Sequence, residues 1–230
     1  MGLKHHPRVV TNGLVMYLDA ANTRSYSGSG NTVFNLALSS AIGGTISAGI
    51  SYTSINPQTF TATSDSNYIF SDYTLASGTS FTVFMWFKRQ TSSFWSALFG
   101  NEVWNSGTGY VARLESATTI RFSRGGDGIG IVYSNAALIS ANFNHYAFVK
   151  NPSGTDSFIY INGVQVANGS IADVSITKPF VFNSRWENTG SSPSTGDSKQ
   201  NQFSNIAVYN RALSAQEVLQ NYNATKKRYL

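Results

Sequence analysis

Short apolar runs separated by turn residues recur along the chain, and they predict strands. The longest is Phe81–Arg89, which reads FTVFMWFKR and is apolar at almost every position, as expected of a central strand buried on both faces. The other runs that predict strands are Leu14–Leu18, Gly109–Leu114, Thr119–Ser123, Phe143–Lys150, Ser157–Ile161, Val164–Ala167, Lys178–Phe182 and Phe203–Tyr209. About a dozen short strands, with turns roughly every ten residues, are typical of a two-sheet sandwich.

The turns between these runs contain residues with specific backbone preferences. Asn162-Gly163 gives the tightest hairpin signal, because this pair suits a two-residue turn. Asn151–Gly154 predicts another turn, since its proline cannot donate to a sheet and its glycine permits positive φ. Ser25–Asn31 and Asn188–Gln202 are rich in Gly, Ser and Asn, and we interpret both as long loops. We therefore expect a single domain at 13–225, an N-terminal arm at 1–12 and a basic C-terminal tail at 226–230.

One helix is predicted near the C-terminus. Ser214 and Glu217 have the spacing of a capping box, in which each side chain accepts from the other residue's backbone N–H. Val218, Leu219 and Tyr222 then share one helical face. We expect a short helix that packs on the sandwich by this face.

Composition supports β structure and removes several functional classes. Aromatic residues make up 13% of the 230 residues and charged residues only 12%, which disfavours helical bundles and coiled coils. The chain has no cysteine, which excludes disulfides, thiolate zinc sites and a cysteine nucleophile. No apolar run reaches the ~18 residues of a membrane helix, and Met1–Arg8 lacks the apolar region of a signal peptide. The net charge of +5 comes from scattered residues, so neither nucleic acid nor a membrane is an expected partner.

Four motifs in the second part of the chain resemble those of laminin-G-like, concanavalin-A-like jelly rolls. Phe81–Lys88 is similar to the family's strand F-T-hydrophobic-x-hydrophobic-W-hydrophobic-K, and Asn144–Val149 to its later W-x-H-hydrophobic-A strand. Phe158–Val164 is similar to its Y-hydrophobic-N-G hairpin, and Ser204–Ser214 to its closing strand. The resemblance implies two antiparallel sheets, and carbohydrate binding or assembly more often than catalysis.

The N-terminal part refines this resemblance. Gly13–Asn22, followed by Ser25-Tyr26, resembles a version of the fold common in virion proteins of tailed bacteriophages. The chain departs from the family at Phe60–Tyr68, where many members have an Asp-rich hairpin and this chain retains little acidic charge. No metal site is therefore predicted. The oxygens of Asp19 with Asn22, and of Asp65 with Asn67, are the candidate calcium donors, against the alternative that each is an ordinary turn residue.

The residues that could perform catalysis are sparse. No two of the eleven carboxylates lie fewer than seven positions apart, so the alternating acids of a glycosidase strand are absent, although acids from different strands could still converge. His145 is the only histidine outside the N-terminus, and we interpret it as a structural imidazole bonded to a backbone group. The glycine-rich segment Arg124–Gly130 precedes no helical pattern and is not a dinucleotide site. We expect a protein that is not an enzyme.

Sugar binding has better candidates, because an exposed aromatic ring stacks on a sugar while planar polar groups bond its hydroxyls. Trp86 lies inside the apolar strand and is assigned to the core. The candidate carbohydrate-binding residues are Trp95, Trp104, Asn105, Arg124, Asp127 and Trp186. The alternative is that these tryptophans are core residues or subunit contacts.

The function expected from these observations is that of a virion structural protein of a tailed phage. It would serve as a capsid decoration, head-fibre or tail-associated subunit on the virion surface, with adhesion to cell-surface glycans as an added role. Few charges and scattered large aromatics suit repeated subunit contacts, so the expected partners are further copies of the chain and virion proteins such as the major capsid protein. The alternative is a free-standing bacterial carbohydrate-binding module or a degenerate glycosidase.

Overall fold

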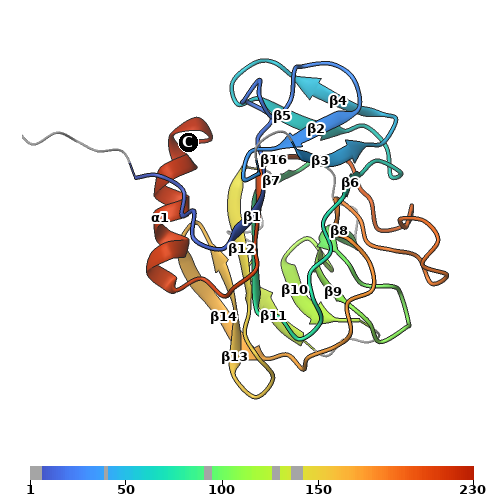
Figure 1. The fold of residues 1–230 in the computed structure, drawn as a ribbon, viewed down its shortest axis with the longest axis vertical. Coiled ribbons are helices and arrows are strands. Elements are labelled where there is room, and N and C mark those ends of the chain that lie inside the picture. The colour runs from blue at the N-terminus through green and yellow to red at the C-terminus, as the bar shows by residue number, and fades with distance from the viewer. Residues whose placement is uncertain (1–6, 39–40, 91–94, 126–129, 136–141) are drawn as a thin grey trace, which may run out of the picture.

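The computed structural model describes residues 7–38, 41–90, 95–125, 130–135 and 142–230 as two antiparallel eight-stranded sheets packed face to face (Figure 1). The first sheet has the order β14 (Val164–Ser170), β13 (Asp156–Ile161), β12 (Asn144–Lys150), β7 (Phe81–Arg89), β16 (Asn201–Tyr209), β5 (Thr59–Ala62) and β4 (Ile50–Thr53), with β1 (Leu14–Leu18) also paired to β16. The second sheet has the order β11 (Gly130–Ser134), β10 (Thr119–Arg124), β9 (Tyr110–Leu114), β8 (Ser96–Gly100), β15 (Val181–Phe182), β6 (Ile69–Ser71), β3 (Ala41–Ile46) and β2 (Thr32–Asn35). The predicted all-β jelly-roll sandwich with one short helix is confirmed.

Strand β7 lies between β12 and β16 and is buried on both faces, as its sequence predicts. Phe81, Val83 and Met85 belong to the core between the sheets, because side chains alternate along a strand. Phe84 belongs to a separate cluster on the outer face of the first sheet, below the helix. The same strand thus supplies two apolar layers.

The sequence pattern does not predict several of the strands, and one predicted strand is much shorter in the structure. The predicted strand Lys178–Phe182 is shortened to the two residues of β15. The strands without a sequence prediction are β2, β3, β4, β5, β6, β8 and β11. They are short, and each contributes few alternating positions from which a period could be read.

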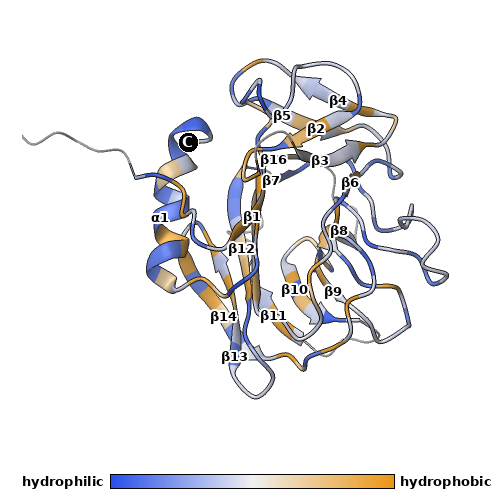
Figure 2. Cartoon of the chain, in the orientation of Figure 1, coloured by the Kyte–Doolittle hydropathy of each residue, from blue (hydrophilic) through white to orange (hydrophobic). Residues whose placement is uncertain are grey.

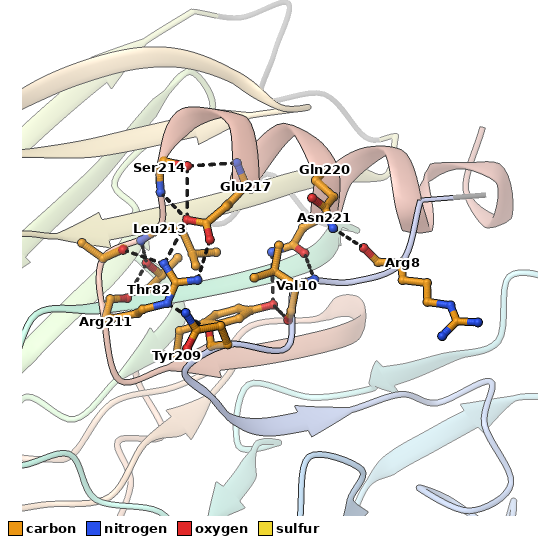
Figure 3. A network of polar contacts seen from close by, with 12 residues as sticks. Arg8, Val10, Thr82, Tyr209, Arg211, Leu213, Ser214, Glu217, Gln220 and Asn221 are labelled. Carbon is orange, nitrogen blue, oxygen red and sulfur yellow. Dashed lines mark hydrogen bonds and ion pairs between the residues drawn. The ribbon is translucent and has the colours of Figure 1, made fainter. Parts of the chain in front are cut away.

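The helix covers the outer face of the first sheet (Figure 1). It runs as α1 (Ala215–Thr225) and continues as a 3₁₀ turn, η1 (Lys226–Arg228). The predicted capping box is present, with Ser214 and Glu217 bonded reciprocally, and Arg211 holds the Glu217 carboxylate through two further contacts of 2.5 and 2.9 Å (Figure 3). Hydrophobic residues follow the strands of both sheets, while the helix is hydrophilic over most of its length (Figure 2). The helix is too short and too polar to cross a membrane.

The N-terminal residues that the structure describes are fastened to this helix (Figure 3). The Val10 N–H donates to Asn221 Oδ1 at 2.8 Å, and its carbonyl accepts from the Tyr209 hydroxyl at 2.9 Å. Gln220 donates to the carbonyl of Arg8 at 2.8 Å. The predicted arm at 1–12 is therefore packed on the domain from residue 8 onward.

Two of the residues predicted as a basic tail, 226–230, also pack on the domain. Arg228 donates to the buried carboxylate of Asp19 at 2.7 Å. Tyr229 stacks on Trp86 with ring centroids 4.3 Å apart. These contacts hold Arg228 and Tyr229 against the domain, while Lys227 and Leu230 are exposed.

Candidate functional site

A cavity of about 310 Å³ lies on the outer face of the second sheet, above β9 and β10. Side chains alternate along a strand, so Ala112 and Phe122 belong to the core while their neighbours Arg113 and Arg121 line the cavity and form its floor. The other lining residues are two tryptophans, two glutamates, a serine and a third arginine: Trp95, Trp104, Glu102, Glu115, Ser123 and Arg124.

Two arginines of the floor stand directly opposite each other. Arg113 and Arg121 are cross-strand partners in the β9–β10 register, where like charges destabilise a sheet. Glu115 offsets this repulsion, because its Oε1 lies 3.2 Å from Arg113 Nη2 and 2.5 Å from Arg121 Nε. The result is a fixed, charged floor with planar donor groups.

Trp95 forms one wall. It immediately precedes β8 and has a φ of +60°, a conformation that costs a bulky residue ~1–3 kcal/mol and that is over-represented at binding sites. The side chain is 49% exposed, and the Arg113 guanidinium carbon lies 4.7 Å from the ring centroid. The cation–π contact orients an indole that is still open to solvent.

Trp104 forms a second wall on the segment between β8 and β9. It is 39% exposed, and the guanidinium carbon of Arg185 lies 4.0 Å from its ring centroid. Arg185 is itself fixed, with Nη1 3.3 Å from Glu102 Oε1 and Nε 2.9 Å from Asp197 Oδ2. The long loop after β15 therefore holds this wall in place through a buried ionic network.

Arg124 ends β10 and lines the same cavity. It pairs in register with Tyr110, the first residue of β9, so it lies where the Trp104-bearing segment rejoins the sheet. Its Nε is buried and has no hydrogen-bond partner among the residues that the structure describes. Because Tyr110 belongs to the core and cross-strand partners share a face of the sheet, the register directs the Arg124 side chain toward the inner face.

A laminin-G-type profile, described as the concanavalin A-like lectin/glucanases superfamily, matches residues 60–219. The chain belongs to this superfamily. The predicted family is thereby confirmed, and the resemblance to phage virion proteins stays a prediction. No curated protein matches the sequence.

Solved structures with the same fold come from toxin binding domains. The binding domain of Paraclostridial Mosquitocidal Protein 1 is 17% identical with a TM-score of 0.66, and the match covers 93% of this chain and 52% of that one. The botulinum neurotoxin serotype D binding domain is 11% identical with a TM-score of 0.69, covering 94% and 53%. Botulinum neurotoxin type C, which enters cells in dependence on an interaction with two ganglioside molecules, is 14% identical with a TM-score of 0.65, covering 93% and 52%. The concanavalin A-like domain thus spans about half the length of these structures, and the likeness shows the fold.

The structure brings three of the six predicted sugar-binding residues together, namely Trp95, Trp104 and Arg124. Asn105 is exposed next to Trp104 in the chain but does not line the cavity. Asp127 lies outside the described residues. The prediction that Trp186 stacks on a sugar is wrong, because only 6% of the residue is exposed.

Burial of Trp186 has a clear cause. Its Nε1 donates to the carbonyl of Pro179 at 2.9 Å, and its ring meets Phe70 edge-on at 5.5 Å. Lys178 covers it, with Nζ 5.0 Å from the ring centroid. The indole anchors the loop after β15 and presents no face to a ligand.

The candidate calcium donors are used by turns and ion pairs. Asp19 Oδ1 accepts from the Ala21 N–H and from Arg228, and Asn22 Oδ1 accepts from the Arg24 N–H. Asp65 is paired with Lys199 at 2.9 Å. Asn67 is 2% exposed, and its Oδ1 accepts the N–H groups of Thr63 and Ser64 at 2.9 and 2.8 Å. Within the described ranges no three His, Cys, Asp or Glu residues are grouped to hold a metal.

Two carboxylates do converge from different segments, as Glu102 and Glu115 both line the cavity. Glycoside hydrolysis needs one carboxyl group to protonate the leaving group and a second to act as nucleophile or base. Here Glu115 contacts two arginines of the floor and Glu102 contacts Arg185. Both carboxylates are held in place by these ion pairs, and their oxygens can also accept hydrogen bonds from hydroxyl groups.

His145 differs from its prediction. The ring is fully buried, with its centroid 4.9 Å from that of Phe84, 5.5 Å from Trp86 and 5.9 Å from Tyr222. Neither ring nitrogen has a hydrogen-bond partner in the part of the chain that the structure describes, so no backbone group satisfies it. Burial lowers the pKa of the imidazole from 6.5 to about 3. It is a neutral packing residue beneath the helix.

The sequence reasoning missed the arginines of the floor, although a signal existed. Gly109–Leu114 and Thr119–Ser123 are consecutive predicted strands with a polar turn between them, and their pairing as a hairpin places Arg113 opposite Arg121. Two like charges at one register position indicate a neighbouring acid or a ligand. Arg185 could not be found in this way, because its contacts join segments far apart in the sequence.

Proposed function

We propose that this concanavalin A-like domain is a non-catalytic glycan-binding protein on the virion surface of a tailed phage. The observation that carries the glycan-binding part is the cavity on the second sheet, where the indoles of Trp95 and Trp104 stand open beside charged planar groups. Its role would be that of a capsid decoration, head-fibre or tail-associated subunit.

The chemistry of the cavity suits a sugar. An indole face stacks on the apolar C–H face of a pyranose, while guanidinium and carboxylate groups bond its hydroxyls. The volume of about 310 Å³ lies at the lower end of the ~300–1,000 Å³ of ligand pockets, which fits a terminal sugar better than a long chain.

Three further observations support binding without turnover. Both glutamates that line the cavity contact arginines, which suits carboxylates that accept hydrogen bonds from a bound sugar. Two of the solved structures with this fold are named as binding domains. A third is of botulinum neurotoxin type C, whose cell entry depends on interaction with two ganglioside molecules.

The virion part of the proposal is supported by the resemblance of Gly13–Asn22, with Ser25-Tyr26, to phage virion proteins. On a particle, many copies would compensate for a weak single site by avidity. The proposed partners are further copies of the chain, other virion proteins such as the major capsid protein, and cell-surface glycans.

A glycan array tests the binding function. The protein is probed beside Trp95→Ala, Trp104→Ala and the control Phe34→Ala, which removes a ring of similar exposure (41%) that does not line the cavity. We expect signals to fall about tenfold in each tryptophan variant and to persist in the control. Equal signals in all four proteins would reject the site, and the absence of any binding would reject the function.

Mass spectrometry of virions purified from the source strain tests the location. We expect the chain in the particles, at hundreds of copies for a capsid subunit or a handful for a tail subunit. Absence from particles, together with a monomer by light scattering, would reject the virion role and favour a free-standing binding module.

A further inference from the structure

A second cavity, of about 560 Å³, lies on the outer face of the first sheet, between the N-terminal segment and the turn that follows the helix. We call it the terminal cavity. Tyr17 of β1 faces it because the neighbouring Met16 and Leu18 belong to the core between the sheets. The polar and charged residues of its lining are Arg8, Tyr17, Asn56, Thr225, Lys227 and Arg228. Its volume is typical of ligand pockets, which measure ~300–1,000 Å³.

A buried polar network lies beneath the terminal cavity and is built on a distortion of β16. The pairing of β16 with β7 is irregular between Ser204 and Ala207, and Asn205 in this bulge has a φ of +51°. The Asn205 side chain accepts from the Tyr17 hydroxyl and donates to Asp19 Oδ1 at 3.2 Å. Bulges and residues with positive φ are over-represented beside functional sites, where a bulge re-aims a side chain.

This network fixes the Arg228 guanidinium group at the wall of the cavity. Arg228 Nη1 donates to Asp19 Oδ1 at 2.7 Å, and this is the oxygen that Asn205 also contacts. The Arg228 side chain is 32% exposed, whereas that of Asp19 is 6% exposed. The arginine, and not the acid, is therefore accessible to a ligand in the cavity.

Two more cations line the cavity, Arg8 and Lys227, and both residues are exposed. The Arg8 side chain extends away from the helix, beyond the carbonyl that Gln220 contacts (Figure 3). Of the eleven carboxylates in the chain, only Asp127 lies outside the described residues, and none of the others lines the cavity. Asp127 follows β10, a strand of the second sheet, which packs on the other face of the first. Residues 1–6, also outside the described ranges, contain no acidic side chain.

We propose that the terminal cavity is a second binding site, for a small organic anion that carries a phosphate or sulfate ester. The three cations bind the ester oxygens through charge-assisted hydrogen bonds. Three cations around one space match a group with three terminal oxygens better than a carboxylate with two. The apolar residues of the lining, Pro7, Val9 and Ala224, contact the organic part of the ligand. This site is separate from the cavity of the second sheet and does not depend on glycan binding there.

The indole N–H signals of the ¹⁵N-labelled protein test the proposal, because they report different parts of the molecule. Trp86 Nε1 donates to Thr225 Oγ1 at 2.7 Å, and Thr225 lines the terminal cavity. Trp95 and Trp104 line the other cavity, and the buried Trp186 serves as a reference. The protein is titrated with glucose, glucose 6-phosphate and glucose 6-sulfate, which share one organic part and distinguish the two esters.

We expect at least one ester to shift the Trp86 signal and to bind about tenfold or more tightly than glucose, as for hydrogen bonds to charged groups. Added salt should weaken this binding, because it screens the attraction between the ester and the exposed cations. The Trp186 signal should stay in place.

Three variants assign the site to its cations. Arg8→Gln should weaken binding of the favoured ester about fivefold, and adding Lys227→Gln should weaken it further. Arg24→Gln removes the same charge from an exposed position that does not line the cavity, and should behave as wild type. Arg228 is left unchanged, because its loss would leave the buried carboxylate of Asp19 without this partner.

The outcomes are decisive for each part of the proposal. A Trp86 signal that moves with neither ester would overturn the site. Glucose binding as tight as that of both esters would overturn the role of the cations. Full affinity in the double variant would overturn the assignment to Arg8 and Lys227. None of these results decides the glycan-binding function, which Trp95 and Trp104 report.

Discussion

Replacing His145 with leucine should make the stability of the protein less dependent on pH. Burial lowers the pKa of this imidazole to about 3, whereas in the unfolded chain it returns to about 6.5. Between these values the unfolded state binds a proton that the folded state does not, so stability falls as the pH drops. From about pH 7.5 to pH 5 the loss is ~2 kcal/mol, at 1.36 kcal/mol per unit below 6.5. This figure depends little on the folded pKa, because the ring is still neutral at the lower pH.

Urea unfolding of the wild type and His145→Leu at both pH values measures the effect. Glu217 does not interfere with this measurement. Its hydrogen-bonded ion pair with Arg211 lowers the pKa of the carboxyl group from 4.5 to about 2. The stability contributed by this pair is therefore lost only as the pH falls below about 4.5. We expect the wild type to lose ~2 kcal/mol more than the variant over this interval. An equal loss in both proteins would refute the interpretation of His145 as a buried neutral group.

Three other substitutions test local features by chemical denaturation. Ser214→Ala removes the helix cap and should cost about 1 kcal/mol; no change would mean that the Arg211 ion pair alone fixes the helix start. Gly163→Ala should destabilise the protein by ~1 kcal/mol or more, because φ is +80° and the added Cβ would lie 2.9 Å from Cδ1 of Leu219 on the helix. Glu115→Gln leaves Arg113 and Arg121 opposed and should cost ~1–3 kcal/mol, with a larger penalty at low salt; an unaltered midpoint would contradict the role given to this carboxylate.

The parts of the fold that could be predicted are those in which a short segment has a complete signal. Phe81–Arg89 is apolar on both faces, and Ser214 with Glu217 contains both halves of a capping box. Strand β3 shows the opposite case, because close packing replaces apolar side chains with glycine. A Cβ on Gly43 would lie 2.5 Å from the Leu18 side chain, and one on Gly44 2.7 Å from a backbone oxygen. No alternation of apolar residues remains there to be read.

In the site, too, neighbours in the sequence predict some features, whereas contacts formed only in the folded chain decide others. Trp104 and Trp186 have similar polar neighbours in the sequence, yet one is exposed and the other is buried. The difference arises from Pro179 and Phe70, which meet Trp186 only in the folded chain. Arg113 follows from the register of a hairpin and was within reach of the sequence, whereas long-range contacts decide which rings stay open.

The packing of Arg8 and Tyr229 beside the helix gives the molecule a direction. Both residues lie on the outer face of the first sheet, and the tryptophan-lined cavity lies on the outer face of the second, with the sandwich between them. A tag, a sensor surface or a larger particle joined to Leu230, the residue after Tyr229, is attached on the side opposite that cavity. A molecule held in this way presents the two open indoles outward, and many copies mounted alike would offer one uniform array of binding sites.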